Sequence, residues 1–425
     1  MQVQLFQMFR VFVFIFFSLM SGQGLFAKTC FLGSVENIKS RDSGLNIKKL
    51  ENSHAQLFEI YELTLLEDGF DSERIFPSSS FLLRSRLSVE KTWDQWFWIV
   101  DEKDEEVKGQ LREFYQNCLG LKLIGHSSLN IAALSATHIG YLSQLDELER
   151  IKAVSDRSHI HSGQIQARIS QREVVTLGFP PRVEAYINSG ANIITAFIVS
   201  DPMIELGGLA RRSHEVVYIH EFRESHPLAR AEWIKFFGAL TGKLEKAKRS
   251  YSKIEESYRT LKDLSSIDNL KLLTGAIYND EWHLSNPDSD FVKMSRGLGA
   301  ELILADSKRP RDQAHPQRFG IESFFIRISE FAGEINLWIP LNSALTWEQL
   351  KSQNRLYEQM TALELSHVWN PVGMVNNYGA NEFWELISVR PDLVLLELYQ
   401  VMELSQSKSS FDTKNFQGRW FTRLK

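Results

Sequence analysis

Short apolar runs alternate with amphipathic segments from about residue 129 to residue 219. Four of these runs have the pattern of buried strands, at residues 130–134, 151–154, 193–199 and 216–219, and residues 138–148 have the pattern of a helix. Strands that are separated by helical segments are typical of parallel βαβ units. The pattern therefore predicts an α/β lobe, which we place at residues 128–226.

The next segment has the pattern of one long helical face. Apolar residues recur at alternating spacings of four and three from Trp233 to Leu261, and most positions between them are charged. This period marks one buried face over about eight turns. Gly238 and Gly242 interrupt the first third, so we expect a short helix, a break near Gly242, and a second helix to about Asp263. The glycines count against a coiled coil, which needs three or four uninterrupted heptads.

The α/β pattern returns after residue 264. Residues 272–278, 335–339 and 393–396 have the pattern of strands, with helical segments between them. This predicts a second lobe at residues 265–425, joined to the first by the helical segment at residues 227–264. The predicted fold class is therefore α/β, with two Rossmann-like lobes that are joined by a single long helix and preceded by a β-rich extension.

The region before the first lobe, at residues 28–127, has a different pattern. Apolar and polar residues partly alternate at residues 57–66, and Trp93, Trp96 and Trp98 crowd a second short segment. Both features favour strands. The charged stretch at residues 101–108 predicts a turn that leads into a helix at residues 107–118. We expect a β-rich N-terminal segment.

The N-terminus has the pattern of a secretion signal. Residues 11–20 form an uncharged apolar run after Arg10, which is shorter than the roughly 20 residues of a membrane span and typical of a signal peptide. We place the signal at residues 1–27, with cleavage after Ala27; an earlier cut and an uncleaved anchor are the alternatives. Lys28 and Thr29 do not suit a lipid-attachment site at Cys30. The protein is therefore expected to be exported.

Composition and charge narrow the class of protein. A chain of 425 residues suggests two or three domains, and its 43% hydrophobic and 24% charged residues are typical of a globular protein. The formal net charge of −5 disfavours nucleic acid as a partner, because phosphate binding needs a basic surface.

The two cysteines, Cys30 and Cys118, exclude a disulfide-rich scaffold and a four-cysteine zinc site. In an oxidising compartment they form either one disulfide or two free thiols. Neither has the neighbouring base or the CxxC partner that would indicate catalysis.

Four local strings resemble one protein family. They lie at residues 133–138, 184–196, 224–238 and 389–395, of which the third is the most specific and the last resembles a helix-to-strand signature. Together they are similar to the helical-backbone class of periplasmic solute-binding proteins, in its iron-complex branch. This class serves ABC importers of iron chelates, haem and corrinoids. The resemblance covers residues 129–425, and it departs from the class at Ala191-Asn192, where the class has Pro-Asp, and after Trp282, where the class has a glycine-rich run.

The resemblance implies a solute site between the two lobes, at loops that follow the carboxyl ends of strands. Arginines would pair with carboxylates or catecholates of the solute, and aromatic rings would lie against its flat apolar surfaces. The candidate solute contacts are Thr137, His138, His159, Ser200, Arg223, Arg230, Tyr278, Trp282, Asn342 and Tyr378.

Several of these residues have a second interpretation. His159 and His161 are spaced so that both imidazoles could ligate a metal from one side of an extended segment. An ordinary pair of loop histidines is the alternative, and we predict no metal site. Arg230 lies in the opening turns of a predicted helix, and Trp282 is alternatively a core residue.

The resemblance also implies one carboxylate on each lobe that pairs with arginines of an inner-membrane permease. Glu184 occupies this position on the first lobe. On the second lobe Trp384 occupies the aligned place, and Glu382 and Glu385 flank it. Ordinary solvated glutamates are the alternative, since one exposed ion pair contributes only about 0–1 kcal/mol.

The expected function is that of the substrate-binding component of an ABC importer. We expect a monomer that binds an iron chelate, haem or a corrinoid and delivers it to the permease. The chain contains no GxSxG, HExxH or P-loop motif, so we predict neither an enzyme nor a bound cofactor. The main alternative is an envelope interaction protein that has kept the fold and lost the solute. A periplasmic enzyme is a third alternative, supported by export and size alone.

Overall fold

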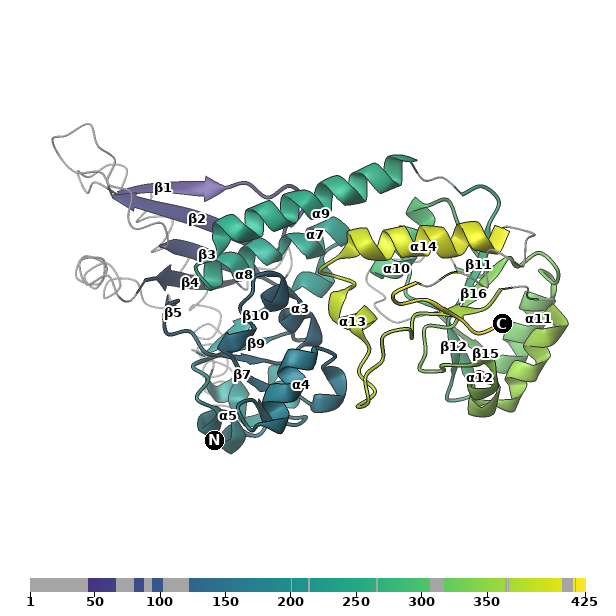
Figure 1. Ribbon diagram of the computed structural model, residues 1–425, viewed down its shortest axis with the longest axis horizontal. Helices are drawn as coiled ribbons and strands as arrows, with labels where there is room; N and C mark the ends of the chain where they lie inside the picture. Colours follow the sequence, from purple (N-terminus) through teal and green to yellow (C-terminus); the bar gives the residue numbers. More distant parts are fainter. Residues whose placement is uncertain are drawn as a thin grey trace, which may run out of the picture. The chain divides into compact units, whose positions relative to one another are not determined.

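The computed structural model (Figure 1) describes residues 45–65, 80–87, 94–101, 122–199, 201–212, 215–264, 267–305, 317–363, 365, 367–406, 416 and 418–425. The predicted signal peptide, the predicted helix at residues 107–118, Ser200 and both cysteines lie outside the described residues. The helices of the described part include none that is long and apolar enough to cross a membrane.

The chain divides into two compact units. The first unit comprises Met1–Ser155, Gln171–Glu224 and Glu232–Arg249, and the second comprises Asp156–Ser170, Ser225–Ala231 and Ser250–Lys425. Each unit is thus assembled from pieces that are far apart in the sequence. The predicted linear domain boundaries remain predictions.

The first unit contains a five-stranded parallel sheet in the order β10-β9-β6-β7-β8. Its strands are β6 (Ile131–Ala133), β7 (Ile151–Val154), β8 (Val175–Thr176), β9 (Ile193–Ala196) and β10 (Val216–Tyr218). Four of them confirm the strands that the apolar runs predict, whereas β8 has two residues, too few to produce a periodic pattern. The α/β class is therefore confirmed for this unit.

Short helices connect these strands. They are α3 (Ala136–Gln144), α5 (Val183–Ser189) and α6 (Pro202–Leu206), with 3-10 turns at η1 (Leu148–Arg150), η3 (Gly207–Arg212) and η4 (Glu221–Arg223). One side of the sheet buries Leu177, Ile194 and Ile198 together with Leu206 of α6. On α3, Tyr141 stacks on Phe237 of α8 (Ile234–Leu240) with 4.9 Å between ring centroids. The helix α3 confirms the helix predicted at residues 138–148, although it ends at Gln144, whereas α6 has no counterpart among the predicted elements.

A second sheet in the first unit comes from the N-terminal region. Its order is β1-β2-β3-β4-β5, with β1 (Leu45–Leu50), β2 (Phe58–Leu65), β3 (Phe81–Arg86), β4 (Asp94–Val100) and β5 (Lys122–Gly125). Neighbouring strands are antiparallel except β4 and β5, and Figure 1 shows β1 to β4 side by side. The predicted β-rich character of this region is confirmed for its described residues.

Two buried carboxylates hold the loop between β1 and β2. Glu232 accepts hydrogen bonds from the backbone N–H groups of residues 53–55 at 2.7–2.8 Å. Glu224 accepts from the N–H groups of residues 56 and 57 at 2.9–3.2 Å and from Nε1 of Trp233 at 3.1 Å. Because buried N–H groups need acceptors, these two glutamates have a structural role that neither the helical pattern nor the resemblance indicates.

Gln95 joins the N-terminal sheet to the edge of the parallel sheet. Its side-chain amide donates to the carbonyl oxygen of Val216 at 3.1 Å and accepts from the N–H of Tyr218 at 2.8 Å. The hydroxyl of Ser85 donates to the carbonyl oxygen of Tyr218 at 2.7 Å. These side chains form hydrogen bonds with the backbone of the edge strand β10, as a further strand would. They therefore cover an edge of the sheet that could otherwise pair with another chain.

The helical segment breaks where its glycines predict. It consists of α7 (Pro227–Glu232), α8 and α9 (Leu244–Leu264). Gly242 has a φ of 71° between α8 and α9, a backbone conformation that glycine adopts without strain. Gly238 lies so close to α9 that a Cβ on it would be 2.4 Å from the Cβ of Ala247. The predicted short helix, break and long helix are confirmed, since α9 ends one residue beyond Asp263.

The second unit contains two three-stranded sheets and a two-stranded one. β14 (Glu301–Leu302), β11 (Lys271–Thr274) and β16 (Leu337–Ile339) are parallel. β12 (Ala276–Tyr278), β13 (Glu281–His283) and β15 (Arg318–Gly320) are antiparallel, as are β17 (Trp369–Asn370) and β18 (Thr422–Arg423). The strand predicted at residues 272–278 is thus two strands, divided at Gly275, where φ is 90° and a Cβ would lie 1.9 Å from the carbonyl oxygen of His283.

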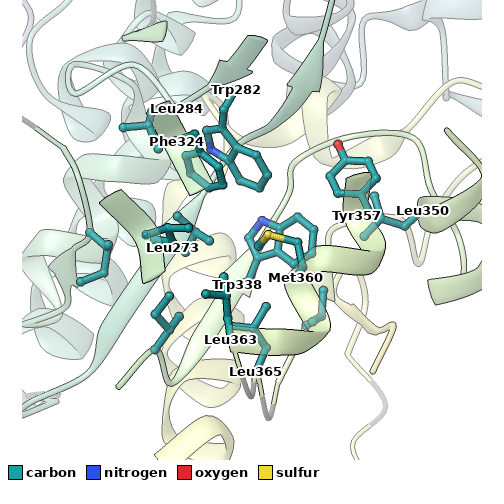
Figure 2. Close-up of a cluster of buried hydrophobic side chains, with 14 of the residues drawn as sticks. Leu273, Trp282, Leu284, Phe324, Trp338, Leu350, Tyr357, Met360, Leu363 and Leu365 are labelled. Atoms are coloured by element: carbon teal, nitrogen blue, oxygen red, sulfur yellow. The ribbon is translucent and has the colours of Figure 1, made fainter. Parts of the chain in front are cut away.

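The second unit also contains helices, of which α11 (Ile321–Ser329) and α12 (Trp347–Gln353) pack against an aromatic core. Further helices are α4 (Gly163–Ser170), α10 (Asp290–Gly297), α13 (Glu382–Leu386) and α14 (Pro391–Gln406), with 3-10 turns at η2 (Arg157–His159) and η5 (Arg355–Leu363). Figure 2 shows Trp282 face to face with Phe324, and their ring centroids are 3.9 Å apart. Trp338 and Tyr357 pack beside them. This core lies between the antiparallel sheet and the helices α11 and α12.

The strand predicted at residues 393–396 is wrong, because these residues lie inside the helix α14. A short apolar run has the same appearance in a buried strand and in a buried helix. Pro391 at the first helical position favours a helix start, and Val394, Leu395 and Leu398 are buried at helical spacing. The helix-to-strand signature of the resembled class is therefore not reproduced at this place.

Candidate functional site

The predicted solute contacts fall in both units. Thr137, His138 and Arg223 belong to the first unit, and Ser200 lies outside the described residues. The others belong to the second unit: His159, Arg230, Tyr278, Trp282, Asn342 and Tyr378. Each unit is therefore considered by itself.

In the second unit a half-buried arginine lies against an exposed tyrosine. The guanidinium of Arg157 lies 3.8 Å from the ring centroid of Tyr378, and 45% of the Tyr378 side chain is exposed. Arg157 is held by hydrogen bonds from Nε to Oε1 of Gln166 at 2.8 Å and from Nη2 to Oγ of Ser170 at 2.6 Å. A flat cation beside an exposed ring suits an anion that carries its own π system.

The segment that carries Arg157 is fastened to the loop that carries Tyr378. Asn376 donates from Nδ2 to the carbonyl oxygen of Ile160 at 2.9 Å, and it accepts at Oδ1 from the backbone N–H of Tyr378 at 2.9 Å. Glu385 accepts at Oε2 from the N–H groups of His161 at 2.8 Å and of Ser162 at 3.3 Å. The position of Arg157 over the ring is thus fixed from both sides.

Neither predicted docking glutamate of the second unit is an exposed carboxylate, which corrects that prediction. Glu385 is buried among the N–H groups that it accepts, and burial raises its pKa to about 7 against the opposing effect of those hydrogen bonds. The side chain on α13 that is exposed is Trp384. Sequence position alone does not reveal which side of a five-residue helix faces inward.

Glu382 is also buried and engaged. It accepts from Nε and Nη2 of Arg419 at 2.5 and 2.7 Å and from Nε1 of Trp420 at 3.0 Å. Burial acts to raise the pKa of Glu382, but the hydrogen bonds and the charge of Arg419 outweigh burial and hold the pKa below its usual value. Glu382 is therefore a structural residue whose negative charge is balanced by Arg419.

The two loop histidines lie in different surroundings. His159 is exposed, whereas His161 places Nδ1 at 3.6 Å from Oε1 of Glu382, and burial lowers the pKa of His161. The part of the chain that the structure describes contains no group of three or more His, Cys, Asp and Glu side chains that could hold a metal ion.

Two predicted contacts, His138 and Trp282, are fully buried, which corrects the prediction for them, whereas Arg230 keeps 13% of its side-chain surface. Trp282 is fully buried, with Nε1 donating to the carbonyl oxygen of Thr274 at 3.2 Å. His138 is fully buried with Nδ1 at 3.1 Å from Oγ1 of Thr195, and burial lowers its pKa to about 3. Arg230 pairs through Nη1 with the buried Asp290 at 3.0 Å. Trp282 and His138 are therefore core residues, and the predicted role of Arg230 stays a prediction.

The other predicted contacts retain accessible surface or have local structural partners. Tyr278 is 65% exposed. Asn342 donates from Nδ2 to Gln353 at 3.1 Å and accepts from Nδ2 of Asn370 at 3.1 Å, so it organises a loop of the second unit. Thr137 donates to Oε1 of Glu221 at 2.7 Å at the start of α3. The placement of Tyr278 and Thr137 leaves their predicted role a prediction.

Arg223 lies at the carboxyl ends of the first unit's parallel strands. Its Nη2 donates to the carbonyl oxygens of Ile198 at 3.2 Å and Val199 at 3.4 Å. Glu184 is exposed in the first turn of α5, which leaves its predicted docking role a prediction. Both residues therefore remain candidates for a functional surface of this unit.

The structure adds Arg157 and Asn376 to the residues that the sequence indicated. Arg157 lies two residues before the predicted contact His159, and Asn376 lies two residues before Tyr378. Their cation and amide were visible in the sequence, but their pairing depends on a contact between residues more than 200 positions apart. No local pattern carries such information.

Comparisons with known proteins give distant similarities. No family model matches the chain. An uncharacterized lipoprotein of Methanocaldococcus jannaschii is 24% identical over 186 residues, which are 43% of this chain and 41% of that protein. The chain is thus matched to less than half the length of this curated relative.

Solved structures with a similar backbone include an ABC transporter substrate-binding protein of Listeria monocytogenes EGD-e, with a TM-score of 0.44 and 12% identity over 64% of this chain and 98% of that one. The periplasmic haem-binding protein HutB of Vibrio cholerae has a TM-score of 0.47 and 12% identity over 66% of this chain and 100% of that one. A periplasmic haem-binding protein of Pseudomonas aeruginosa has a TM-score of 0.46 and 11% identity over 70% of this chain and 98% of that one. With identities this low, function has to be argued from the residues of this chain.

Proposed function

We propose that this protein is the periplasmic solute-binding component of an ABC importer. In this proposal it binds an iron chelate, haem or a corrinoid and delivers it to a permease in the inner membrane, and it catalyses no reaction. The local strings at residues 133–138, 184–196 and 224–238 support the class, and so do the two α/β units. Helix α9 belongs to the first unit up to Arg249 and to the second from Ser250, which suits a class whose lobes share one helix.

The observation that carries the proposal is the Arg157–Tyr378 pair. The ring of Tyr378 is half-exposed, and the guanidinium of Arg157 at 3.8 Å from its centroid adds charge to the same surface. Catecholates, haem propionates and corrinoid phosphates are anions attached to flat or bulky frameworks, so each of them could use both the cation and the ring. Fold alone does not select a solute, and this pair supports the binding of an anion with a flat or bulky framework on the second unit.

Docking to the permease is assigned to the first unit in this proposal. Glu184 is exposed and is the predicted carboxylate, whereas Glu382 and Glu385 are occupied within the second unit. The second unit would therefore meet the permease through other groups, of which the exposed Trp384 lies at the aligned position. Loss of solute delivery on Glu184→Lys, with solute affinity retained, would support this assignment.

The test is a solute titration with two variants and one control. Haemin, cyanocobalamin and a ferric catecholate siderophore are titrated into the protein, and binding is followed by quenching of tryptophan fluorescence. We expect at least one of the three to bind, and we expect Arg157→Gln and Tyr378→Ala each to weaken it by about tenfold, which corresponds to about 1.4 kcal/mol. Arg327→Gln is the control, because Arg327 also lies over a ring, that of Phe319, at 5.5 Å in the second unit.

Two results would count against the proposal. Absence of binding for all three solutes would favour the envelope interaction protein instead. If Arg157→Gln and Tyr378→Ala both bound the solute with wild-type affinity, the pair would not contribute to solute binding. The proposal would then lose the observation on which it rests.

A further inference from the structure

One peptide group in the second unit is held from both sides. This is the peptide group between Ile160 and His161, which lies between η2 and α4. Its N–H donates to Oε2 of Glu385 at 2.8 Å. Its carbonyl oxygen accepts from Nδ2 of Asn376 at 2.9 Å and from Nε2 of Gln166. These three side chains come from α13, from the loop before α13 and from α4, so three parts of the unit meet at this peptide group.

The same side chains reach Arg157. Gln166 accepts at Oε1 from Nε of Arg157 at 2.8 Å, and it donates from Nε2 to the backbone carbonyl oxygen of Arg157 at 3.0 Å. Asn376 accepts from the backbone N–H of Tyr378, whose ring lies against the Arg157 guanidinium. Two side-chain amides therefore connect Arg157, the peptide group and Tyr378. We call residues 157–162 the arginine segment.

Glu385 is the ionisable member of this arrangement. Gln166 and Asn376 carry amides, which keep one charge state at every pH. Glu385 accepts from the N–H groups of His161 and Ser162, and a carboxylate accepts more strongly than a neutral carboxyl group. These hydrogen bonds therefore favour the ionised form. Burial acts in the opposite direction because it removes water from the charge, and only 4% of Glu385 is exposed.

The effect of burial outweighs that of the hydrogen bonds. Burial raises the pKa of Glu385 to about 7, and the negative charge of Glu382 acts in the same direction. Glu385 therefore binds its proton more tightly while the arginine segment lies on it than after the segment has lifted off and admitted water. Loss of the proton consequently favours the lifted state.

Ionisable groups face Glu385 and its neighbour Glu382 from three elements. On α13 itself, Glu382 pairs with Arg419 of the C-terminal strand, which holds the pKa of Glu382 below its usual value. On the arginine segment, the ring of His161 places Nδ1 at 3.6 Å from Oε1 of Glu382, and burial lowers the pKa of this ring. Above about pH 6.5 Glu382 is therefore ionised and His161 is neutral. Of these groups, Glu385 is the one that changes its charge near pH 7.

We propose that Glu385 is a positioning residue of the solute site: with its proton it holds the arginine segment so that Arg157 lies over Tyr378, and without its proton it lets the segment lift. Solute is then held more firmly on the acidic side of neutrality and released more readily on the alkaline side. This inference rests on the proposed function only where it concerns the solute, because the segment moves in the protein without solute as well.

The movement is measured without solute, by amide hydrogen exchange between pH 5.5 and pH 8. Peptides that contain residues 160–162 report on the arginine segment, and peptides from α11 serve as an internal reference. The variant is Glu385→Gln, which keeps an acceptor and cannot ionise. Glu397→Gln is the matched control, because Glu397 is also a buried carboxyl group of the second unit that accepts two backbone N–H groups, at 2.8 and 2.7 Å, and burial raises its pKa as well.

Exchange rates are divided by the intrinsic rate at each pH, which gives the protection of the arginine segment. In wild-type protein we expect this protection to fall by at least about tenfold from pH 5.5 to pH 8, because proton loss is coupled to lifting. In Glu385→Gln the protection should stay constant over this range, and Glu397→Gln should follow wild type. The α11 peptides should show no change in any of the three proteins.

The consequence for the solute is measured by titrating haemin, cyanocobalamin and a ferric catecholate siderophore at pH 5.5 and pH 8. Each is titrated into wild type and into Glu385→Gln. Because the acid groups of the solute titrate equally with both proteins, the ratio of the two affinities isolates Glu385. We expect the affinity of wild type relative to the variant to fall by about threefold or more from pH 5.5 to pH 8, since only molecules with the segment in place bind fully.

Constant protection of the arginine segment in wild-type protein would overturn the inference, and this profile decides even if Glu385→Gln is too unstable to measure. An equal fall in Glu385→Gln would overturn it too, and so would a constant affinity ratio, since Arg157 would then not depend on Glu385. Solute binding with constant protection would leave the proposed function standing. Conversely, the expected fall in protection without binding of any of the three solutes would remove the proposed function and leave the hold of Glu385 on the segment.

Discussion

The carboxylate of Glu385 accepts a hydrogen bond from the backbone nitrogen of His161 at 2.8 Å, across more than 220 positions of the sequence. The same oxygen accepts from Ser162, directly before α4. The second unit therefore contains a segment that is held by one buried carboxyl group. This group is poised to titrate, because burial raises its pKa to about 7.

Glu385 should make the stability of the protein depend on pH near neutrality. Its pKa is raised from 4.5 in the unfolded chain to about 7 in the folded one, so the folded state binds the proton more tightly. Its contribution is then fully present below about pH 4.5 and is lost as pH rises to about 7, which amounts to about 3 kcal/mol at most. Glu385→Gln keeps an acceptor but cannot ionise.

The measurement is the thermal unfolding midpoint of wild type and Glu385→Gln between pH 5 and pH 8. We expect the variant to gain stability relative to wild type as pH rises through this range. The neighbouring His161 is present in both proteins and Glu382 stays ionised in both over this range, so the difference between the two profiles reports on Glu385. Parallel pH profiles would show that the buried carboxyl group does not titrate in this window.

Glu232 should be among the most sensitive positions of the first unit. Glu232→Ala leaves the N–H groups of residues 53–55 and the Lys235 ammonium without this acceptor, and Glu232 is fully buried. We expect the free energy of unfolding to fall by about 3 kcal/mol. Urea unfolding followed by tryptophan fluorescence measures this, with Glu256→Ala on the exposed side of α9 as the control, expected within about 0.5 kcal/mol. Equal losses in both variants would contradict the assigned role.

Trp282 and Tyr278 should behave in opposite ways. Trp282→Ala removes a ring that is stacked on Phe324 and should destabilise the second unit by about 3–5 kcal/mol. Tyr278→Ala changes an exposed ring and should change stability by about 0.5 kcal/mol or less. Chemical unfolding of both variants tests this. A stable Trp282→Ala protein with reduced solute affinity would return Trp282 to the set of solute contacts.

Much of the local structure could be predicted, because it follows from the spacing of apolar residues and from the backbone conformations that glycine allows. The strands β6, β7, β9 and β10 are short β-branched or apolar runs, and the break at Gly242 reflects a positive φ that glycine adopts without strain. The one strand that was wrong, at residues 393–396, fell where a buried helix and a buried strand have the same short pattern.

The functional surface was less predictable. The sequence indicated Tyr378 and Arg223 as candidate solute contacts, but it did not indicate Arg157 or Asn376. Exposure is a property of the folded chain, so Ile204 in a short helix has the same appearance in the sequence as a core isoleucine. Glu382 and Glu385 illustrate the reverse case, since a carboxylate that is expected at the surface is buried once Arg419 or a backbone N–H group can satisfy it.

The sequence by itself determined the α/β character, the N-terminal strands and the helix that ends near Asp263, because hydrophobic period and glycine positions act over a few residues. Only the tertiary structure decided that the chain passes several times between two units, that Glu224 and Glu232 bind the loop at residues 53–57, and that Arg157 lies over Tyr378. These outcomes depend on contacts between distant residues. Such contacts are selected by burial and hydrogen-bond satisfaction in the whole fold, and they leave no periodic trace in the sequence.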